Sequence, residues 1–181
     1  MIIDKLHMEV WMISLIGNHH ADALRTVTIP KWQNEGFTIN LFNAIIPDKI
    51  ENLSNQLNFG LKHTLGKGIR EFTNTEKAVW YSHLQLWEKC SIGNMTFLII
   101  EEDTKPKKRF PNSIVVDRLY KISSAGSGYI LRPITAKKMV KRALNKKLTY
   151  NVDSFISSFN DKDTIEYAMQ VKREMRSISH N

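Results

Sequence analysis

Apolar residues along the first hundred positions form short runs typical of β-strands. The run EVWMISLIG, which ends at Gly17, and the run FTINLFNAI, which follows Gly36, each predict a strand. The run TFLII, residues 96–100, is almost continuously apolar, as expected for a strand covered on both faces. Three strands of one sheet are therefore expected before residue 101.

Other segments carry apolar residues at helical spacing. The segment TNTEKAVWYSHLQLWEKCSIGN predicts a helix that begins with a capping box of Thr73 or Thr75 with Glu76 and ends near Gly93. TAKKMVKRALNKK predicts a basic amphipathic helix. A short helix is expected over residues 22–27, before a turn at Pro30. The segment PDKIENLSNQLNFG predicts another helix, followed by the Gly-rich loop GKGIR.

The alternation of strands with helices predicts the fold class. Strands separated by helices favour an α/β fold with a mainly parallel sheet. Residues 104–128 contain Pro106, Pro111, Gly126 and Gly128 and are expected to be irregular. Since neither a repeat nor a linker is visible, residues 1–181 are expected to form a single domain.

Composition narrows the class of protein. The chain has 181 residues, 42% of them hydrophobic, with only 8 Gly and 5 Pro, which favours a globular domain over disorder. Its one cysteine, Cys90, excludes an internal disulfide and suits a reducing compartment. Asp4, Lys5 and His7 interrupt the apolar N-terminus, and no apolar run approaches the ~20 residues of a membrane helix. We expect a soluble, cytoplasmic protein.

The positive charge is concentrated in one part of the chain. The formal net charge is +8, and residues 104–147 contain thirteen Lys or Arg against one acid, Asp117. Such a field attracts polyanions, but a solvated surface that keeps the protein soluble is equally compatible with it. A nucleic-acid-binding protein is an alternative class, although no zinc finger, RNA-recognition signature or helix-turn-helix pattern is visible.

Three carboxylates follow the apolar run FLII, where a buried strand is expected to end. In open α/β sheets the ligand crevice lies at the carboxyl ends of the strands. Alternation along a strand places Glu101 and Asp103 on one face and Glu102 on the other. Two acids on one face suit a hard divalent cation, Mn²⁺ or Mg²⁺, which bridges protein and phosphate. The competing interpretation is a solvated acidic cluster that pairs with Lys105, Lys107 or Lys108.

The segment TEKAVWYSHLQLW, followed about ten residues later by FLIIEED, resembles glycosyltransferase family 25, the lipooligosaccharide-biosynthesis and collagen-galactosyltransferase group. Shorter similarities in the same order occur at WMISL, FNAI, GSGYILRPITAKKMV and YNVDSFI. The chain departs from the family pattern where Ala78 and Val79 replace Gly-Cys and where Glu102 replaces Asp.

This resemblance implies a single Rossmann-like nucleotide-diphospho-sugar transferase of the GT-A type. It implies a UDP-hexose donor such as a galactose donor, a divalent cation, and a glycan or other hydroxyl acceptor, with an anionic acceptor or peripheral membrane contact compatible with the basic region. A catalytically inactive binding module of the same fold is the alternative. The implied site residues are Glu101 and Asp103 for the metal, Ser14, Arg25, Glu76, Ser82, His83 and Glu102 for the donor, and Asp153 as the base, with Asp117 in reserve.

Overall fold

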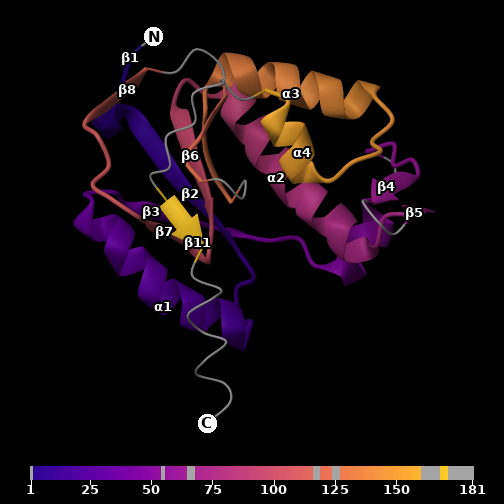
Figure 1. Ribbon diagram of the computed structural model, residues 1–181, viewed down its shortest axis with the longest axis horizontal. Helices are drawn as coiled ribbons and strands as arrows, with labels where there is room; N and C mark the ends of the chain where they lie inside the picture. The colour runs from indigo at the N-terminus through magenta and orange to yellow at the C-terminus, as the bar shows by residue number, and fades with distance from the viewer. Residues whose placement is uncertain are drawn as a thin grey trace.

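A five-stranded sheet, in the order β3-β2-β6-β10-β9, forms the centre of the fold (Figure 1). A computed structural model describes residues 2–53, 56–64, 68–115, 119–123, 127–159 and 168–170. The sheet strands are β2 (Met8–Ser14), β3 (Ile39–Asn43), β6 (Thr96–Glu101), β9 (Leu119–Lys121) and β10 (Gly128–Leu131). Two-stranded pairs join β1 (Ile2–Asp4) to β8 (Ser113–Val115), β4 (Lys62–Thr64) to β5 (Gly68–Arg70), and β7 (Thr104–Pro106) to β11 (Ala168–Gln170).

The sheet is mixed, so the α/β class is confirmed and the mainly parallel sheet is corrected. Strand β2 runs parallel to β3 and β6, whereas β10 runs antiparallel to β6 and β9. A parallel partner needs a crossover connection, usually a helix. Among the described residues between β6 and β10 there is no helix, because the chain returns through β7, β8 and β9.

Helices cover both faces of the sheet (Figure 1). Helix α1 (His19–Asn34) lies on one face, and α2 (Asn74–Ile92), α3 (Pro133–Asn145) and α4 (Val152–Ser157) lie on the other. Alternate strand residues serve the two layers: along β6, Leu98 and Ile100 belong to the core beneath α1, while Phe97 and Ile99 belong to the core beneath α2. Two 3-10 helices, Lys5–His7 and Pro47–Asn52, complete the described elements.

The best-marked helix forms as predicted. Thr73 caps α2 and accepts a hydrogen bond from the backbone N–H of Glu76, whose carboxylate accepts in return from the Thr73 N–H. The helix ends at Ile92, before Gly93. Helix α3 confirms the predicted basic helix, with a start two residues earlier at Pro133.

Two other predictions were wrong in extent. Helix α1 continues through Pro30 because residues on both sides are anchored by tertiary contacts: the buried Trp32 indole donates to the Thr104 carbonyl at 2.8 Å, and the Thr28 hydroxyl donates to the Glu102 carbonyl at 2.8 Å. The segment expected to form a helix before Gly60 contains only the short 3-10 helix Pro47–Asn52 among its described residues.

Candidate functional site

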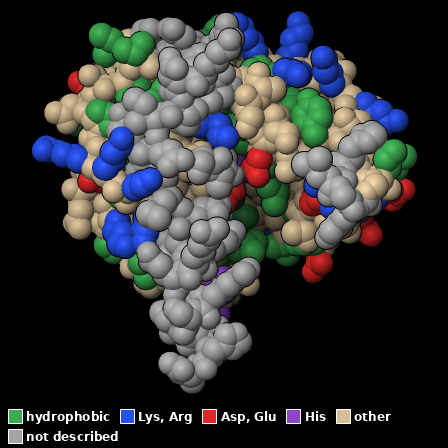
Figure 2. Space-filling model, viewed as in Figure 1, with side chains coloured by type: hydrophobic (Ala, Val, Ile, Leu, Met, Phe, Trp, Pro, Cys, Tyr) green, Lys and Arg blue, Asp and Glu red, His purple; other side chains and the backbone are tan. Residues whose placement is uncertain are grey.

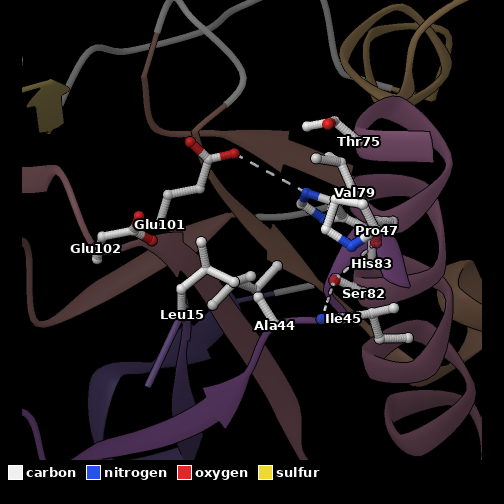
Figure 3. A pocket seen from close by; sticks show the side chains of 12 residues that line it. Leu15, Ala44, Ile45, Pro47, Thr75, Val79, Ser82, His83, Glu101 and Glu102 are labelled. Atoms are coloured by element: carbon white, nitrogen blue, oxygen red, sulfur yellow. Dashed lines mark hydrogen bonds and ion pairs between the residues drawn. The ribbon is translucent and has the colours of Figure 1, made fainter. Parts of the chain in front are cut away.

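A pocket lies at the carboxyl ends of β2 and β6, beneath the N-terminal half of α2 (Figure 3). Its volume is about 270 Å³. Figure 3 shows Glu101 and Glu102 on one side of the pocket and Ser82 and His83 on the other. The described residues that line it are Ile13, Leu15, Ala44, Ile45, Pro47, Thr75, Ala78, Val79, Ser82, His83, Glu101 and Glu102.

The strand pattern explains why a carboxylate faces α2. Phe97 and Ile99 point into the α2 layer, and Glu101 is the next residue of that alternating series. Glu101 pairs with Ile13 in the register between β6 and β2. The Glu102 N–H then donates to the Ile13 carbonyl at 3.1 Å, which holds the second carboxylate at the same edge. Two adjacent acids therefore line one pocket.

Asp103 does not lie where strand alternation predicted it. Strand β6 ends at Glu101, and residues 102 and 103 form a turn before β7. The period-two rule therefore no longer applies after Glu101. Glu101 and Glu102, half-buried, line the pocket together, whereas Asp103 is buried and lies outside the lining residues. The expectation that Glu102 faces away from Glu101 was wrong; a metal role for Asp103 remains a prediction.

His83 projects from α2 into the wall of the pocket. Its Nε2 lies 4.0 Å from Oε1 of Glu101, and its Nδ1 lies 2.8 Å from the Tyr129 hydroxyl. Burial lowers the pKa of His83 to about 4, because the charged ring would lose its hydration. The imidazole is therefore neutral at neutral pH.

Ser82 links α2 to the segment that follows β3, and both line the pocket. Its hydroxyl accepts a hydrogen bond from the Ile45 N–H at 2.9 Å and donates to the Ala78 carbonyl at 2.8 Å (Figure 3). Ala78 lines the pocket, and its small side chain fits the packed helix, as does the partly exposed Val79. A direct contact of Ser82 with a donor remains a prediction.

Glu76 has structural partners outside the pocket. Its carboxylate pairs with Lys62 of β4 and with Arg70 of β5, at 2.7 Å from Arg70 Nη1, in addition to capping α2. The Arg70 hydrogen bonds contribute most to lowering the pKa of Glu76 far below its ordinary value, and Lys62 adds to the effect. Glu76 thus ties the β4–β5 pair to α2. Its predicted donor contact stays untested.

Arg25 and Ser14 lie together behind the end of β2. The Arg25 guanidinium donates to the buried Ser14 hydroxyl and, at 3.4 Å, to the Leu15 carbonyl, and it pairs with Asp22. Leu15 lines the pocket, but neither Arg25 nor Ser14 does. The two residues therefore hold the strand end that forms one wall.

The two predicted bases are not both described. Asp117 lies outside the described residues. Asp153 is half-buried in the first turn of α4, which packs on α2, and it is not among the lining residues. The pKa of Tyr129 is raised well above its ordinary value, mainly by burial and to a smaller extent by the charges of Glu101, Cys90 and Asp153. Asp153 therefore interacts electrostatically with the Tyr129 hydroxyl.

Neither Tyr129 nor Ile45 was predicted as a site residue, although each lies in one of the short segments similar to the family, GSGYILRPITAKKMV and FNAI. Tyr129 lies in the apolar strand GYIL, and its hydroxyl reaches His83 only because β10 pairs with β6 beneath α2. Ile45 contributes a backbone N–H, which no side-chain pattern marks. Both contacts depend on tertiary structure.

The carboxylate side chains that line the pocket suit a divalent cation. Glu101 and Glu102 can supply the hard oxygen ligands that such an ion prefers. Among the described residues, no group of three or more His, Cys, Asp or Glu side chains is arranged so that it could hold a metal ion. Mg²⁺ and Mn²⁺ suit such a site, because they complete their shells with water and phosphate oxygens.

A second cavity, of about 320 Å³, lies near the β4–β5 pair. It is lined by Phe59, Gly60, Leu61, Glu71, Phe72, Lys77 and Lys147. None of the site residues predicted from the sequence lies in it, so the pocket at the β2 and β6 ends is the candidate site.

The fold and the site define a mixed α/β protein with an acidic pocket at the carboxyl ends of two parallel strands. The family model described as glycosyltransferase family 25 (LPS biosynthesis protein) matches residues 8–115. The chain belongs to this family, and this confirms the resemblance seen in the sequence. The matched range covers β2 through β8 and hence the whole lining of the pocket.

Membership of the family implies glycosyltransferase activity, with a nucleotide-sugar donor and a glycan acceptor. No curated protein matched the chain. Asp153, α3 and α4 lie beyond the range that the family model matches. In the part of the chain that the structure describes, no helix combines the length and the apolar character needed to span a membrane.

Proposed function

We propose that the pocket binds the diphosphate of a nucleotide-sugar donor through Mn²⁺ or Mg²⁺ held by Glu101 and Glu102. The observation that carries this proposal is the position of two carboxylates, Glu101 and Glu102, in the lining of one pocket at the carboxyl ends of β2 and β6. A diphosphate placed beside two carboxylates is repelled unless a cation lies between them. The bound cation would offset the negative charge that grows on the nucleoside diphosphate as the sugar leaves.

The remaining pocket residues orient the donor. Ile13, Ala44, Ile45 and Pro47 form an apolar wall that excludes water from one side of the ligand. A volume of about 270 Å³ is below the ~300–1,000 Å³ of pockets that enclose whole drug-sized ligands. The pocket therefore takes one part of the donor, and the rest extends toward the exposed side chains of Thr75 and Val79 at its mouth.

The proposed reaction moves a hexose, galactose-like in the first instance, from UDP to an acceptor hydroxyl. Asp153 remains the proposed base that takes the hydroxyl proton, since α4 packs on the same helix that carries His83. An anionic acceptor is favoured by the lysines on the exposed side of α3, whose charge is seen along that edge in Figure 2. The exposed cations there are Lys137, Lys138 and Lys141.

The proposal is tested by calorimetric titration of UDP, and then of UDP-hexoses, with and without Mn²⁺. Binding should require the ion and should be lost in Glu101→Gln and in Glu102→Gln. Asp103→Asn, measured beside them, separates the strand-alternation prediction from the observed lining: it should retain binding if Glu102 is the second ligand. Glu71→Gln is the matched control, because Glu71 is exposed and lies outside the pocket.

Failure of UDP to bind with Mn²⁺, in protein whose circular dichroism shows an intact fold, would contradict a UDP-dependent site. Other nucleotide donors would then be titrated. Absence of binding to all of them would favour the inactive binding module. Steeply salt-dependent binding to DNA of any sequence would instead favour the nucleic-acid-binding alternative.

A further inference from the structure

A chain of buried hydrogen bonds leads from the core to His83, the histidine beside the pocket carboxylate Glu101. The Trp87 indole N–H donates to the Tyr129 hydroxyl at 2.8 Å, and this hydroxyl lies 2.8 Å from His83 Nδ1. All three side chains are almost fully buried. The other ring nitrogen, Nε2, faces Oε1 of Glu101 at 4.0 Å. The chain therefore connects β10 and α2 to the end of β6.

The direction of these hydrogen bonds follows from the number of protons. An indole N–H can only donate, so the Tyr129 oxygen accepts from Trp87. The single hydroxyl proton then needs an acceptor, because a buried polar proton without one is costly. In the described structure the Tyr129 hydroxyl contacts Trp87 and His83, and only His83 Nδ1 can accept. Nδ1 is therefore unprotonated, and in a neutral ring the proton is on Nε2.

We infer that Tyr129 and Trp87 are positioning residues that hold His83 as the Nε2–H tautomer, with its N–H directed toward Glu101. Neither residue touches the pocket, so both act through His83. The opposite tautomer would direct a nitrogen lone pair at the carboxylate and repel it. These hydrogen bonds thus give the pocket a neutral hydrogen-bond donor, the Nε2–H of His83, whose direction is determined in the core.

The consequence for ligand binding rests on the proposed function. A neutral N–H directed toward Glu101 at 4.0 Å attracts the carboxylate through its bond dipole, without a hydrogen bond in this structure. It adds no positive charge, so it does not compete with a cation for the same oxygens. Outer-shell donors of this kind commonly orient the ligands of metal ions.

The first test uses nitrogen-15 NMR of the histidine rings in the ligand-free protein at neutral pH. Long-range proton–nitrogen correlations distinguish the two tautomers, and His83→Gln identifies the signal among the six histidines. We expect Nε2–H in the wild type. Tyr129→Phe keeps the ring and removes the hydroxyl, and we expect it to shift His83 toward the Nδ1–H form.

Tyr81→Phe is the matched control. Tyr81 is on α2, the helix that carries His83, but its hydroxyl donates to the Leu53 carbonyl. Loss of this hydroxyl should therefore leave the His83 tautomer unchanged. An Nδ1–H ring in the wild type would overturn the inference even if Tyr129→Phe does not fold. An unchanged tautomer in folded Tyr129→Phe would overturn it as well.

The second test compares the affinity for UDP with Mn²⁺ in the wild type and in Tyr129→Phe. We expect binding about fivefold weaker in the variant, the size of effect typical of one hydrogen bond. A switched tautomer with unchanged affinity would overturn the positioning role. If the wild type fails to bind UDP and Mn²⁺, the proposed function fails, and the positioning role at that site fails with it; the tautomer result then still decides the structural part.

Discussion

The hydroxyl of Ser82 lies 2.9 Å from the backbone nitrogen of Ile45, and this hydrogen bond joins helix α2 to the segment that follows β3. The two residues lie side by side in the lining of the pocket (Figure 3). Since Ser82 donates at the same time to the Ala78 carbonyl, its position on the helix is defined. The packing of α2 against this segment therefore depends in part on one serine.

Replacement of Ser82 by Ala should destabilise the protein. The variant leaves the part-buried Ile45 N–H without its acceptor, which typically costs about 1–2 kcal/mol. Urea unfolding of wild type and variant measures the difference. Ser91→Ala is the control on the same helix, because the Ser91 hydroxyl donates only to the local Glu88 carbonyl. Equal losses in the two variants would mean that the hydrogen bond between Ser82 and Ile45 contributes nothing specific.

The pKa of His83 predicts how stability depends on pH. In the folded protein this pKa is lowered to about 4, whereas an unfolded histidine titrates near 6.5. The unfolded state therefore binds a proton first, so the contribution of His83 to stability is complete above about pH 6.5 and is lost as the pH falls toward 4. The loss from this group is about 3 kcal/mol.

The measurement is the free energy of unfolding of wild type minus that of His83→Gln, from pH 7.5 to pH 4. Subtraction removes the titration of carboxylates common to both proteins. The charged neighbour on the exposed side of the ring is Glu101, at 4.0 Å, and the neighbour on the other side is Tyr129. His20→Gln, the same substitution at an exposed site in α1, is the control. A difference for His83→Gln that does not change with pH would refute the prediction.

We expect Glu76 to contribute to the stability of the fold and not to UDP binding. Glu76→Gln weakens the capping box and the pairs with Lys62 and Arg70, so we expect a loss of about 1–2 kcal/mol in the free energy of unfolding. UDP affinity should change little, because Glu76 does not line the pocket. Chemical denaturation and calorimetry on the same preparations separate the two effects.

Glu71, an exposed acid near Glu76 in the sequence, provides the comparison for Glu76. Glu71→Gln should leave stability nearly unchanged, since the contact from Arg70 is to its backbone carbonyl. If Glu76→Gln abolished UDP binding while the fold and its stability stayed close to those of wild type, the direct donor contact predicted from the sequence would be supported instead.

The sequence was most informative where local and tertiary preferences agree. Helix α2 combines a capping box with apolar residues at helical spacing, and both signals lie within one short segment. Strand β6 was recognisable because both of its faces are covered. Pro30 shows the opposite case: local chemistry favours an end to the helix, but the distant partner Thr104 holds Trp32 in place and the helix continues.

The site was predictable as a location and less so as a set of contacts. The acidic residues and the Ser82-His83 pair were identified, because both lie in short motifs. The face of each carboxylate was not, since alternation holds only while a strand continues and β6 ends at Glu101. Tyr129 could not be connected to His83 without the antiparallel pairing of β10 with β6.

Arg25 provides the last prediction, because it distinguishes a supporting role from direct contact with phosphate. The guanidinium holds the buried Ser14 hydroxyl and the Leu15 carbonyl at the end of β2. Arg25→Gln should therefore lower the free energy of unfolding by about 1–2 kcal/mol and weaken UDP binding indirectly, through displacement of Leu15.

Salt dependence separates the two roles of Arg25. A direct ion pair with phosphate is screened, so its removal would reduce affinity much more at 20 mM than at 500 mM salt. An indirect effect through the strand end should reduce affinity by a similar factor at both concentrations, and that is the result we expect. Lys31→Gln makes the same change of charge on α1 away from the strand end and corrects for the overall field. A loss of affinity confined to low salt in Arg25→Gln, but absent in Lys31→Gln, would assign Arg25 to the donor phosphate.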